Sequence, residues 1–462
     1  MDSFLNYLSP FSWRYASPEM RSIWSEIHKR QLWRKIWLTL ATVQSHYGLV
    51  NADQLSELKL NVNHIDMDSA LKLEAEIHHD LMAELKTFAS QCPQAGGILH
   101  LGATSMDIED NADALRIREA LDMILKSLSK LLIILASQIE KYADLPVMAY
   151  THLQPAEPTT LGYRFCVYAQ DLLEDWHHLA EIRSHIRGKG FKGAVGTGAS
   201  FADLIGLENL EDFEASLSRE LELPFYSISS QTYPRKQDFD VLSALAGLGA
   251  SLHKFALDIR VLQSPSIGEM SEPFATNQVG SSAMPFKRNP IQAEKIDSLA
   301  RQLAVLPQVA WQNSANSILE RTLDDSANRR SILPEAFLIS DELLLVSTRL
   351  MEGFKVHEKA IQRNLDKYAP FAATERLMMA TSKKGADRQV IHELIRQHAL
   401  TAWNAIQNGD ENPLLQTLIN DSSLKQWLSK SEIESLSDIQ SYTGFAKQRA
   451  LDFVSKIRLS LD

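Results

Sequence analysis

Three short polar stretches of the sequence hold the residue types that could do acid–base or anion-binding chemistry. They are His78 to Asp80, His100 to Ser105, and Thr151 to Thr160. Histidine exchanges a proton near neutral pH, with a reference pKa of about 6.5. The chain has 14 histidines, so most are expected to be ordinary surface or core residues. His152 is the strongest candidate, because the Thr and Pro residues beside it are expected to begin a helix, whose free N–H groups favour a bound anion.

A fourth polar stretch, Arg321 to Arg330, combines three arginines with short polar side chains. Arginine suits bidentate recognition of a carboxylate or a phosphate. The same string also fits an exposed helix start held by ion pairs. Taken alone, these residues leave both interpretations open.

No pattern of metal ligands or of a nucleophile elbow stands out. His357-Glu358 and His392-Glu393 lack the second histidine of a zinc helix, and two distant cysteines, Cys92 and Cys166, make no cluster. The string Gly-x-Ser-x-Gly is absent. We therefore expect no metal site.

Two connections differ from ordinary helix turns. The stretch from Ser264 to Pro290 is rich in Ser, Gly and Pro, and loops of this length are often lids or binding loops. The stretch from Gly188 to Gly198 holds five of the 19 glycines and matches dinucleotide and kinase glycine-loop strings. Both of those loops need a preceding strand, but the preceding segment here is predicted to be helical. We expect the first connection to be functional and the second to be a flexible surface connection.

Long helices are expected to position these stretches. Apolar residues recur every three or four positions from Leu121 to Ile139 and from Val241 to Leu262, which places one apolar stripe against neighbouring helices. Further helices are expected at about Leu161 to Arg187, Ile291 to Leu306 and Ser331 to Met351. Gly and Pro together make up only 35 of 462 residues (19 and 16), which favours long uninterrupted helices over an all-β fold. The sequence therefore predicts an all-α fold built on a bundle of long helices.

The spacing of these patterns suggests three domains. Shorter helical patterns precede and follow the long ones, so we expect a small helical domain at 1–107, a central bundle at 108–354 and a small helical domain at 355–462. No internal repeat is found.

Composition and charge exclude several classes of protein. Hydrophobic residues make up 45% of the chain, which excludes a disordered protein, and the net charge of −11 argues against a nucleic-acid partner. The most apolar stretch, Val241 to Leu252, is 12 residues long and is too short to span a membrane. Met1 to Met20 does not read as a signal peptide, and two cysteines make no disulfide framework. We expect a soluble, cytoplasmic protein.

Four strings give the chain a resemblance to a known family. Ser281 to Pro290 resembles the signature loop of the fumarase/aspartase superfamily, whose Ser-Ser-x-Met-Pro-x-Lys-x-Asn core is highly specific. Arg14 to Met20, Ser229 to Tyr233 and Glu320 to Arg330 resemble adenylosuccinate lyases, and the last of these, with Leu248 to Ile259, resembles the branch found in animals. The resemblance runs from about Arg14 to at least residue 400, and the last 60 residues hold no motif that we can place.

The resemblance implies a three-domain, all-α subunit and a homotetramer whose active sites are shared between subunits. It implies a β-elimination that releases fumarate from adenylosuccinate, giving AMP, and from the succinyl-carboxamide ribotide (SAICAR), giving the carboxamide ribotide (AICAR). No cofactor is implied, because the substrate's own carboxylate can delocalise the carbanion. The implied partners are anionic nucleotides.

By this resemblance Ser281 is the general base, with the Gly280 amide and Lys287 stabilising its alkoxide. His152 corresponds to the general acid, Glu294 to the carboxylate that orients it, and His79 to a second active-site histidine. His100 lies in a matching string and has a weaker claim.

The remaining predicted site residues are implied to bind substrate. The nucleotide and phosphate set is Arg14, Tyr15, Arg321, Ser326 and Arg330; donors to the succinyl carboxylates are Thr104, Ser105, Lys287 and Asn289; further contacts are His78, Asp80, Gln231 and Lys295. His78 and Lys295 stand where the family or its closest branch has arginine, which predicts a stronger pH dependence of substrate binding than in relatives with arginine.

Two other functions fit parts of the same evidence. One is another lyase of the superfamily, such as argininosuccinate lyase or aspartase, although a substrate without phosphate would not need the strings around Arg14 and Arg321. The other is a catalytically silent helical scaffold, which the presence of Ser281, His152, Lys287 and Glu294 argues against.

Overall fold

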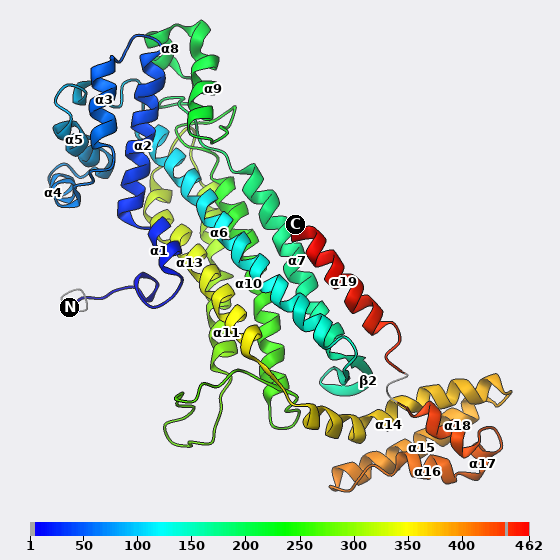
Figure 1. Ribbon diagram of the computed structural model, residues 1–462. Coiled ribbons are helices and arrows are strands. Elements are labelled where there is room, and N and C mark those ends of the chain that lie inside the picture. Colours follow the sequence, from blue (N-terminus) through cyan, green and yellow to red (C-terminus); the bar gives the residue numbers. More distant parts are fainter. Residues whose placement is uncertain (1–4, 439–441, 462) are drawn as a thin grey trace. The chain divides into compact units, whose positions relative to one another are not determined.

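The computed structural model describes residues 5–438 and 442–461 (Figure 1). It divides into two compact units, each assembled from three separate stretches. Unit 1 comprises residues up to Leu128, Asp175–Ala250 and Ser298–Leu345; unit 2 comprises Ser129–Glu174, Ser251–Asp297 and the residues from Val346 onward. The three-domain division expected from the sequence stays a prediction.

Helices dominate the fold, as the sequence predicts. Five of them contribute residues to both units: α6 (Ser105–Lys141), α7 (Leu161–His185), α10 (Lys236–Gln263), α11 (Ile291–Leu303) and α13 (Asp324–Gly353). The predicted apolar stripes are buried, with Leu121, Leu128 and Leu132 fully inaccessible on α6 and Val241, Leu245 and Leu252 on α10. The expectation of an all-α fold built on long helices is therefore confirmed.

The other elements of unit 1 are short helices. They are η2 (Pro10–Ser12), α1 (Pro18–Ile23), α2 (Glu26–Ser45), α3 (Ala52–Asn61), α4 (Met67–Ile77), α5 (Asp80–Gln91), η3 (Gly96–Ile98), α8 (Ala199–Ile205), η4 (Leu207–Asn209), α9 (Leu210–Glu220) and α12 (Leu306–Ala315).

Unit 2 adds two small sheets and further helices. The strands are β1 (Pro146–Thr151), β2 (Gln154–Thr160), β3 (Met270–Ser271) and β4 (Lys355–Val356). The helices are α14 (Glu358–Lys383), α15 (Arg388–Gln407), α16 (Leu414–Asn420), α17 (Ser422–Lys425), α18 (Lys430–Leu436) and α19 (Ala446–Leu461). No helix in the described part of the chain has the length and apolar character needed to cross a membrane.

The segment around His152 differs from the prediction. The helix predicted from about Leu161 is present as α7, but the stretch before it is a hairpin: β1 and β2 pair antiparallel, with Thr151 opposite Gln154. His152 and Leu153 form the two-residue turn with φ of +54° and +60°, as the twist of a tight hairpin requires. Two prolines in β2 lack the N–H group that a helix interior needs, which opposes a helix here. The placement of His152 at a helix N-terminus was therefore wrong.

Candidate active site

A cavity of about 670 Å³ in unit 1 brings together nine of the predicted site residues. They come from four stretches of the chain that are far apart in sequence: His78, His79, Asp80, Thr104, Ser105, Gln231, Arg321, Ser326 and Arg330. The two arginines and the hydroxyl, amide and imidazole groups make the lining rich in hydrogen-bond donors. Such a lining suits a ligand with several anionic oxygens.

The junction of α4 and α5 positions the histidine pair. His78 ends α4 in a left-handed conformation, with φ of +56°. The adjacent His79 caps α5, where its Nδ1 accepts a hydrogen bond from the Met82 N–H at 3.4 Å. Asp80 then begins α5, and its Oδ2 accepts a hydrogen bond from the Arg330 guanidinium at 2.9 Å. The reversal between two helices thus places three consecutive polar side chains at the cavity.

The start of α6 supplies Ser105, its first residue, and Thr104 just before it. The Thr104 N–H donates to Asp107 Oδ2 at 2.9 Å, and the buried Asp107 also forms an ion pair with Lys189. Lys189 itself is fully buried and donates to the Gly193 carbonyl at 2.8 Å. The stretch 188–193 is therefore a buried support for the start of α6, and its interpretation as a flexible surface connection was wrong. The sequence gives no sign of this, because a lysine is rarely fully buried.

The start of α13 presents two stripes of side chains. Ser326 and Arg330 line the cavity, while Asp325 and Arg329 are buried one position earlier on each turn. Arg321, just before the helix, donates to Asp325 Oδ1 at 2.8 Å. One helix therefore carries both the anion-binding groups and the groups that anchor them.

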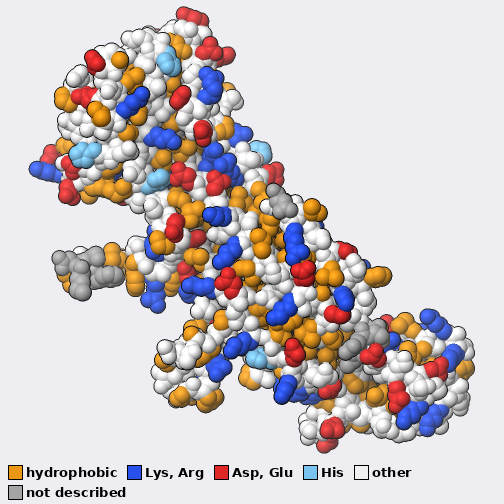
Figure 2. Space-filling model, in the orientation of Figure 1, with side chains coloured by type: hydrophobic (Ala, Val, Ile, Leu, Met, Phe, Trp, Pro, Cys, Tyr) orange, Lys and Arg blue, Asp and Glu red, His pale blue; other side chains and the backbone are white. Residues whose placement is uncertain are grey.

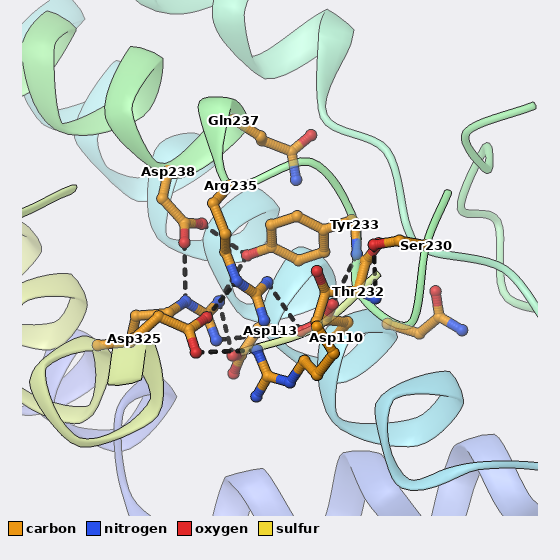
Figure 3. Close-up of polar contacts among 12 residues, drawn as sticks. Asp110, Asp113, Ser230, Thr232, Tyr233, Arg235, Gln237, Asp238 and Asp325 are labelled. Carbon is orange, nitrogen blue, oxygen red and sulfur yellow. Dashed lines mark hydrogen bonds and ion pairs between the residues drawn. The ribbon is translucent and has the colours of Figure 1, made fainter. Parts of the chain in front are cut away.

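The anchoring residues form a buried ionic network that joins α6, α10 and α13 (Figure 3). Arg235 donates to Asp325 at 2.5 Å and to Asp110 at 3.0 Å. Arg329 donates to Asp238 at 2.7 Å and to the Tyr233 hydroxyl at 2.7 Å. Every charge in this set has a partner of opposite sign, which burial demands.

The same network sets the charge state of the group that holds Arg321. Burial acts to raise the pKa of Asp325, but the guanidinium groups of Arg235 and Arg321 outweigh it and hold that pKa below its usual range. Asp325 is therefore ionised at neutral pH and keeps Arg321 in place. Gln231 lies two residues before Tyr233, whose backbone N–H donates to Asp110 at 2.7 Å, so the network also anchors this part of the lining.

Arg14 and Tyr15 lie in unit 1 but are not among the residues that line this cavity. The exposed Arg14 guanidinium lies 5.6 Å from the Trp13 ring centroid, and the Tyr15 ring packs on Phe11. The chain directly after them is anchored to α13, because the Ala16 and Ser17 N–H groups donate to Glu342 and Asp341 at 2.9 and 2.6 Å. Their assignment to the phosphate site stays a prediction.

The other predicted site residues belong to unit 2. His152 is exposed at the β1–β2 turn. In the long loop, the Ser281 Oγ accepts a hydrogen bond from the Met284 N–H at 3.2 Å. A side chain at Gly280 would collide with the Lys287 carbonyl, so only glycine fits this close approach. Lys287 is exposed in the same turn.

Asn289, Glu294 and Lys295 follow at the start of α11. The buried Glu272 caps this helix, accepting hydrogen bonds from the Gln292 and Ala293 N–H groups at 3.0 and 2.6 Å. Within the described residues of one chain, no hydrogen bond or ion pair joins Glu294 to His152. The predicted orienting contact between them stays a prediction.

Glu269, at the base of the loop, links it to the hairpin. This fully buried carboxylate pairs with Arg164 at 3.2 Å and accepts from Asn364 at 2.9 Å. The Tyr150 hydroxyl of β1 lies 3.5 Å from Glu269 Oε1, and burial raises the pKa of that phenol. The base of the loop and β1, the strand that leads to His152, thus share one polar anchor.

His100 is not suited to be the acid. Its Nδ1 accepts a hydrogen bond from the Trp37 indole at 3.0 Å, and burial lowers its pKa. A neutral imidazole with one nitrogen occupied by a core tryptophan is a structural residue.

The sequence-based prediction missed the residues that support the site. They are Asp107, Asp110, Lys189, Tyr233, Arg235, Asp238, Glu269, Glu272, Asp325 and Arg329, together with Glu109 in the cavity wall. One feature of the sequence points to two of them: Asp325 and Arg329 have the same four-residue spacing as Ser326 and Arg330, one position earlier, and so lie on one face of the same helix. The long-range partners left no local signal.

Known proteins are similar to this chain over most of its length. The family described as Lyase matches residues 41–304, and the family described as Adenylosuccinate lyase C-terminus matches residues 370–451, so the similarity extends into the part that held no recognisable motif. Adenylosuccinate lyase of Saccharomyces cerevisiae is 41% identical, over 99% of this chain and 95% of its own. That of Schistosoma mansoni is 40% identical, over 91% of this chain and 89% of its own.

A solved structure has the same fold. The 3-carboxy-cis,cis-muconate lactonizing enzyme from Pseudomonas putida superposes with a TM-score of 0.86 and 25% identity, covering 98% of this chain and 99% of that one. Identity near 40% over almost the whole length, with both family matches, is decisive. This chain belongs to the adenylosuccinate lyase family.

Proposed function

We propose that this protein cleaves adenylosuccinate to AMP and fumarate, and SAICAR to AICAR and fumarate. The observation that carries the proposal is the 670 Å³ cavity, in which Arg321, Ser326 and Arg330 meet the histidine pair. The curated relatives named adenylosuccinate lyase, which cover nearly all of the chain, support the same conclusion.

The reaction is a β-elimination that needs a base, an acid and donors for the developing charge. Ser281, as its alkoxide, removes the proton from the carbon next to the leaving C–N bond, and the electron pair passes through the succinyl carboxylate. The C–N bond then breaks, fumarate forms, and His152 protonates the departing nitrogen. Lys287 and the Gly280 amide stabilise the alkoxide, Glu294 orients His152, and His79 assists.

Binding roles divide between the units. In unit 1, Arg321, Ser326 and Arg330, with Arg14 and Tyr15, hold the nucleotide and its phosphate, while Thr104 and Ser105 donate to the succinyl carboxylates. In unit 2, Lys287 and Asn289 also donate to those carboxylates. His78, Asp80, Gln231 and Lys295 make further substrate contacts.

A homotetramer with shared active sites is part of the proposal, as is location in the cytoplasm. Apolar side chains are visible at the surface over the long helices (Figure 2). Ile133 on α6, Val167 on α7 and Leu257 on α10 are 54%, 44% and 43% exposed. Association of the long helices would bury them.

Turnover by the purified protein tests the proposed reaction. Adenylosuccinate should yield AMP and fumarate in equal amounts, and argininosuccinate should yield no fumarate. Ser281→Ala and His152→Ala should each lower kcat by at least about a hundredfold, the usual contribution of a general acid or base. Thr276→Ala, an exposed change in the same loop, is the matched control. Absence of fumarate from folded wild-type protein would refute the proposal.

A further inference from the structure

Glu109 is one of three acidic residues, with Glu74 and Asp80, in the wall of the donor-rich cavity. It lies on α6 one turn after Ser105, and both side chains line the 670 Å³ cavity. A second cavity of about 100 Å³, lined by Trp24, Trp33 and their neighbours, shares part of this wall. The residues that line both cavities are Asp80, Met106, Glu109, Arg321, Ser326 and Arg330. Glu109 is therefore placed among the very groups that suit an anion.

Among the described residues, Glu109 differs from the neighbouring acids in having no hydrogen-bond or ion-pair partner. Asp80 pairs with Arg330 at 2.9 Å, Asp113 with Arg329 at 3.1 Å, and Glu26 with Lys29 at 2.7 Å. For Glu109, no hydrogen bond or ion pair is found to any residue between 5 and 438 or between 442 and 461. Its carboxyl group can therefore form a hydrogen bond with a ligand in the cavity.

The charges around Glu109 come from every element packed against the cavity. They are Glu26 and Lys29 of α2, Glu74 of α4 and His78 at its end, His79 and Asp80 at the start of α5, Asp110, Asp113 and Arg116 of α6, and Arg321, Arg329 and Arg330 at the start of α13. Burial, followed by the negative charges of Asp80, Asp113 and Asp110, raises the pKa of Glu109 to about 8, against a smaller opposing effect of Lys29. At neutral pH the group is a carboxylic acid with an O–H to donate.

We propose that Glu109 is a further ligand-binding residue of this cavity, whose carboxylic acid donates a hydrogen bond to an anionic oxygen of the nucleotide. The identity of the nucleotide rests on the proposed function. The neutral acid can approach a phosphate or carboxylate oxygen that an ionised carboxylate would repel. Glu109 thereby limits the pH range over which the anion is bound.

The proposal predicts how affinity changes with pH. Only the protonated form binds, so the apparent Kd is the intrinsic Kd divided by the protonated fraction. With a pKa of about 8, that fraction falls about tenfold between pH 7 and pH 9. The phosphate of AMP, with a second pKa of about 6, is mainly a dianion across this range and does not cause the change.

Calorimetric titration with AMP at pH 7, 8 and 9 and constant ionic strength tests the proposal. Wild-type affinity should fall about tenfold, whereas Glu109→Gln, which keeps an N–H donor but cannot ionise, should vary by less than about twofold. Glu109→Leu should bind more weakly than wild type at pH 7 and show no such dependence. Asp122→Asn removes an exposed charge from the same helix outside the cavity and should keep the wild-type profile.

Three results would overturn the inference. They are wild-type affinity that is constant or rises toward pH 9, a Glu109→Gln profile equal to that of wild type, and no AMP binding at pH 7. The wild-type profile alone decides the question if a variant fails to fold. Turnover of adenylosuccinate is measured separately. If fumarate is released but Glu109→Gln binds AMP with the same pH dependence as wild type, only this inference is refuted. If AMP binding depends on pH as expected but no fumarate is released, only the proposed reaction is refuted.

Discussion

Arg330 is a predicted anion-binding residue whose guanidinium is largely exposed. Its side chain is 59% exposed, and its partner is the Asp80 carboxylate at 2.9 Å. A carboxylate in that position resembles an anionic oxygen of a ligand, so substrate would compete with Asp80 for the guanidinium. Replacing the exposed ion pair of Arg330 with Asp80 by a bidentate contact with the ligand costs little free energy.

Replacing Arg330 should therefore affect binding more than chemistry. We expect Arg330→Met to raise KM for adenylosuccinate roughly ten- to a hundredfold with little change in kcat, because a hydrogen bond to a charged group contributes about 1.5–3 kcal/mol. Steady-state kinetics measure both parameters. Arg183→Met, which removes a surface pair with Asp122, is the control. A fall in kcat at unchanged KM would contradict the binding role.

The raised pKa of Glu109 also predicts how stability depends on pH. The folded state keeps a proton that the unfolded state loses above its ordinary pKa of 4.5. Between that value and about 8, the folded state binds more protons, so stability falls as pH rises through this window. Glu109→Gln should flatten the fall in Tm of the ligand-free protein across the window. An equal slope in wild type and variant would show that Glu109 titrates normally.

At the scale of elements, α13 carries two adjacent stripes of side chains with different roles. Ser326 and Arg330 face the cavity, while Asp325 and Arg329 tie the helix to α6 and α10. The cavity lining is held by buried charges, and such networks tolerate the loss of a member poorly.

Removing one buried arginine should destabilise unit 1 strongly. Arg235→Met leaves Asp110 and Asp325 buried without their shared partner, for an expected loss of about 3–5 kcal/mol in the free energy of unfolding. The next residue provides a control, since Lys236→Met removes an exposed pair with Asp240 and a surface contact with the Phe239 ring, and should cost less than about 1 kcal/mol. Urea denaturation compares the two, and similar midpoints would mean that the network contributes little.

At the scale of the whole molecule, the predicted catalytic residues are distributed over two compact units. His79 lies in unit 1, whereas His152, Ser281, Lys287 and Glu294 lie in unit 2. Among the described residues of one chain, no hydrogen bond or ion pair joins the exposed His152 to Ser281. A homotetramer with shared sites would supply these groups from different subunits.

Mixing inactive variants tests this arrangement. His152→Ala and Ser281→Ala subunits, unfolded and refolded together in equal amounts, should recover up to about a quarter of wild-type activity if the two residues come from different subunits, because one site in four then receives both intact groups. Each variant refolded alone is the control. No recovery in mixed tetramers, with mass confirmed by sedimentation, would place both residues in one subunit.

The sequence by itself determined the helical fold, the family and nine residues of one cavity. These features are local. Apolar residues that recur every three or four positions predict a helix, and short strings such as His78 to Asp80 and Arg321 to Arg330 contain the reactive and anion-binding side chains themselves. The helix predicted from about Leu161 is present, but His152 does not lie at its start, because the stretch before the helix forms a hairpin whose tight turn and two prolines oppose a helix.

Only the tertiary structure decided what surrounds those residues. Arg235 meets Asp110 and Lys189 meets Asp107 across 125 and 82 positions, and burial of such pairs depends on packing that no local pattern records. The same holds for Glu109, an ordinary helix residue in the sequence whose pKa is raised to about 8 by burial and by carboxylates that the fold brings near. The protonation state of a buried side chain depends on the groups around it, and those groups come together only when the chain folds.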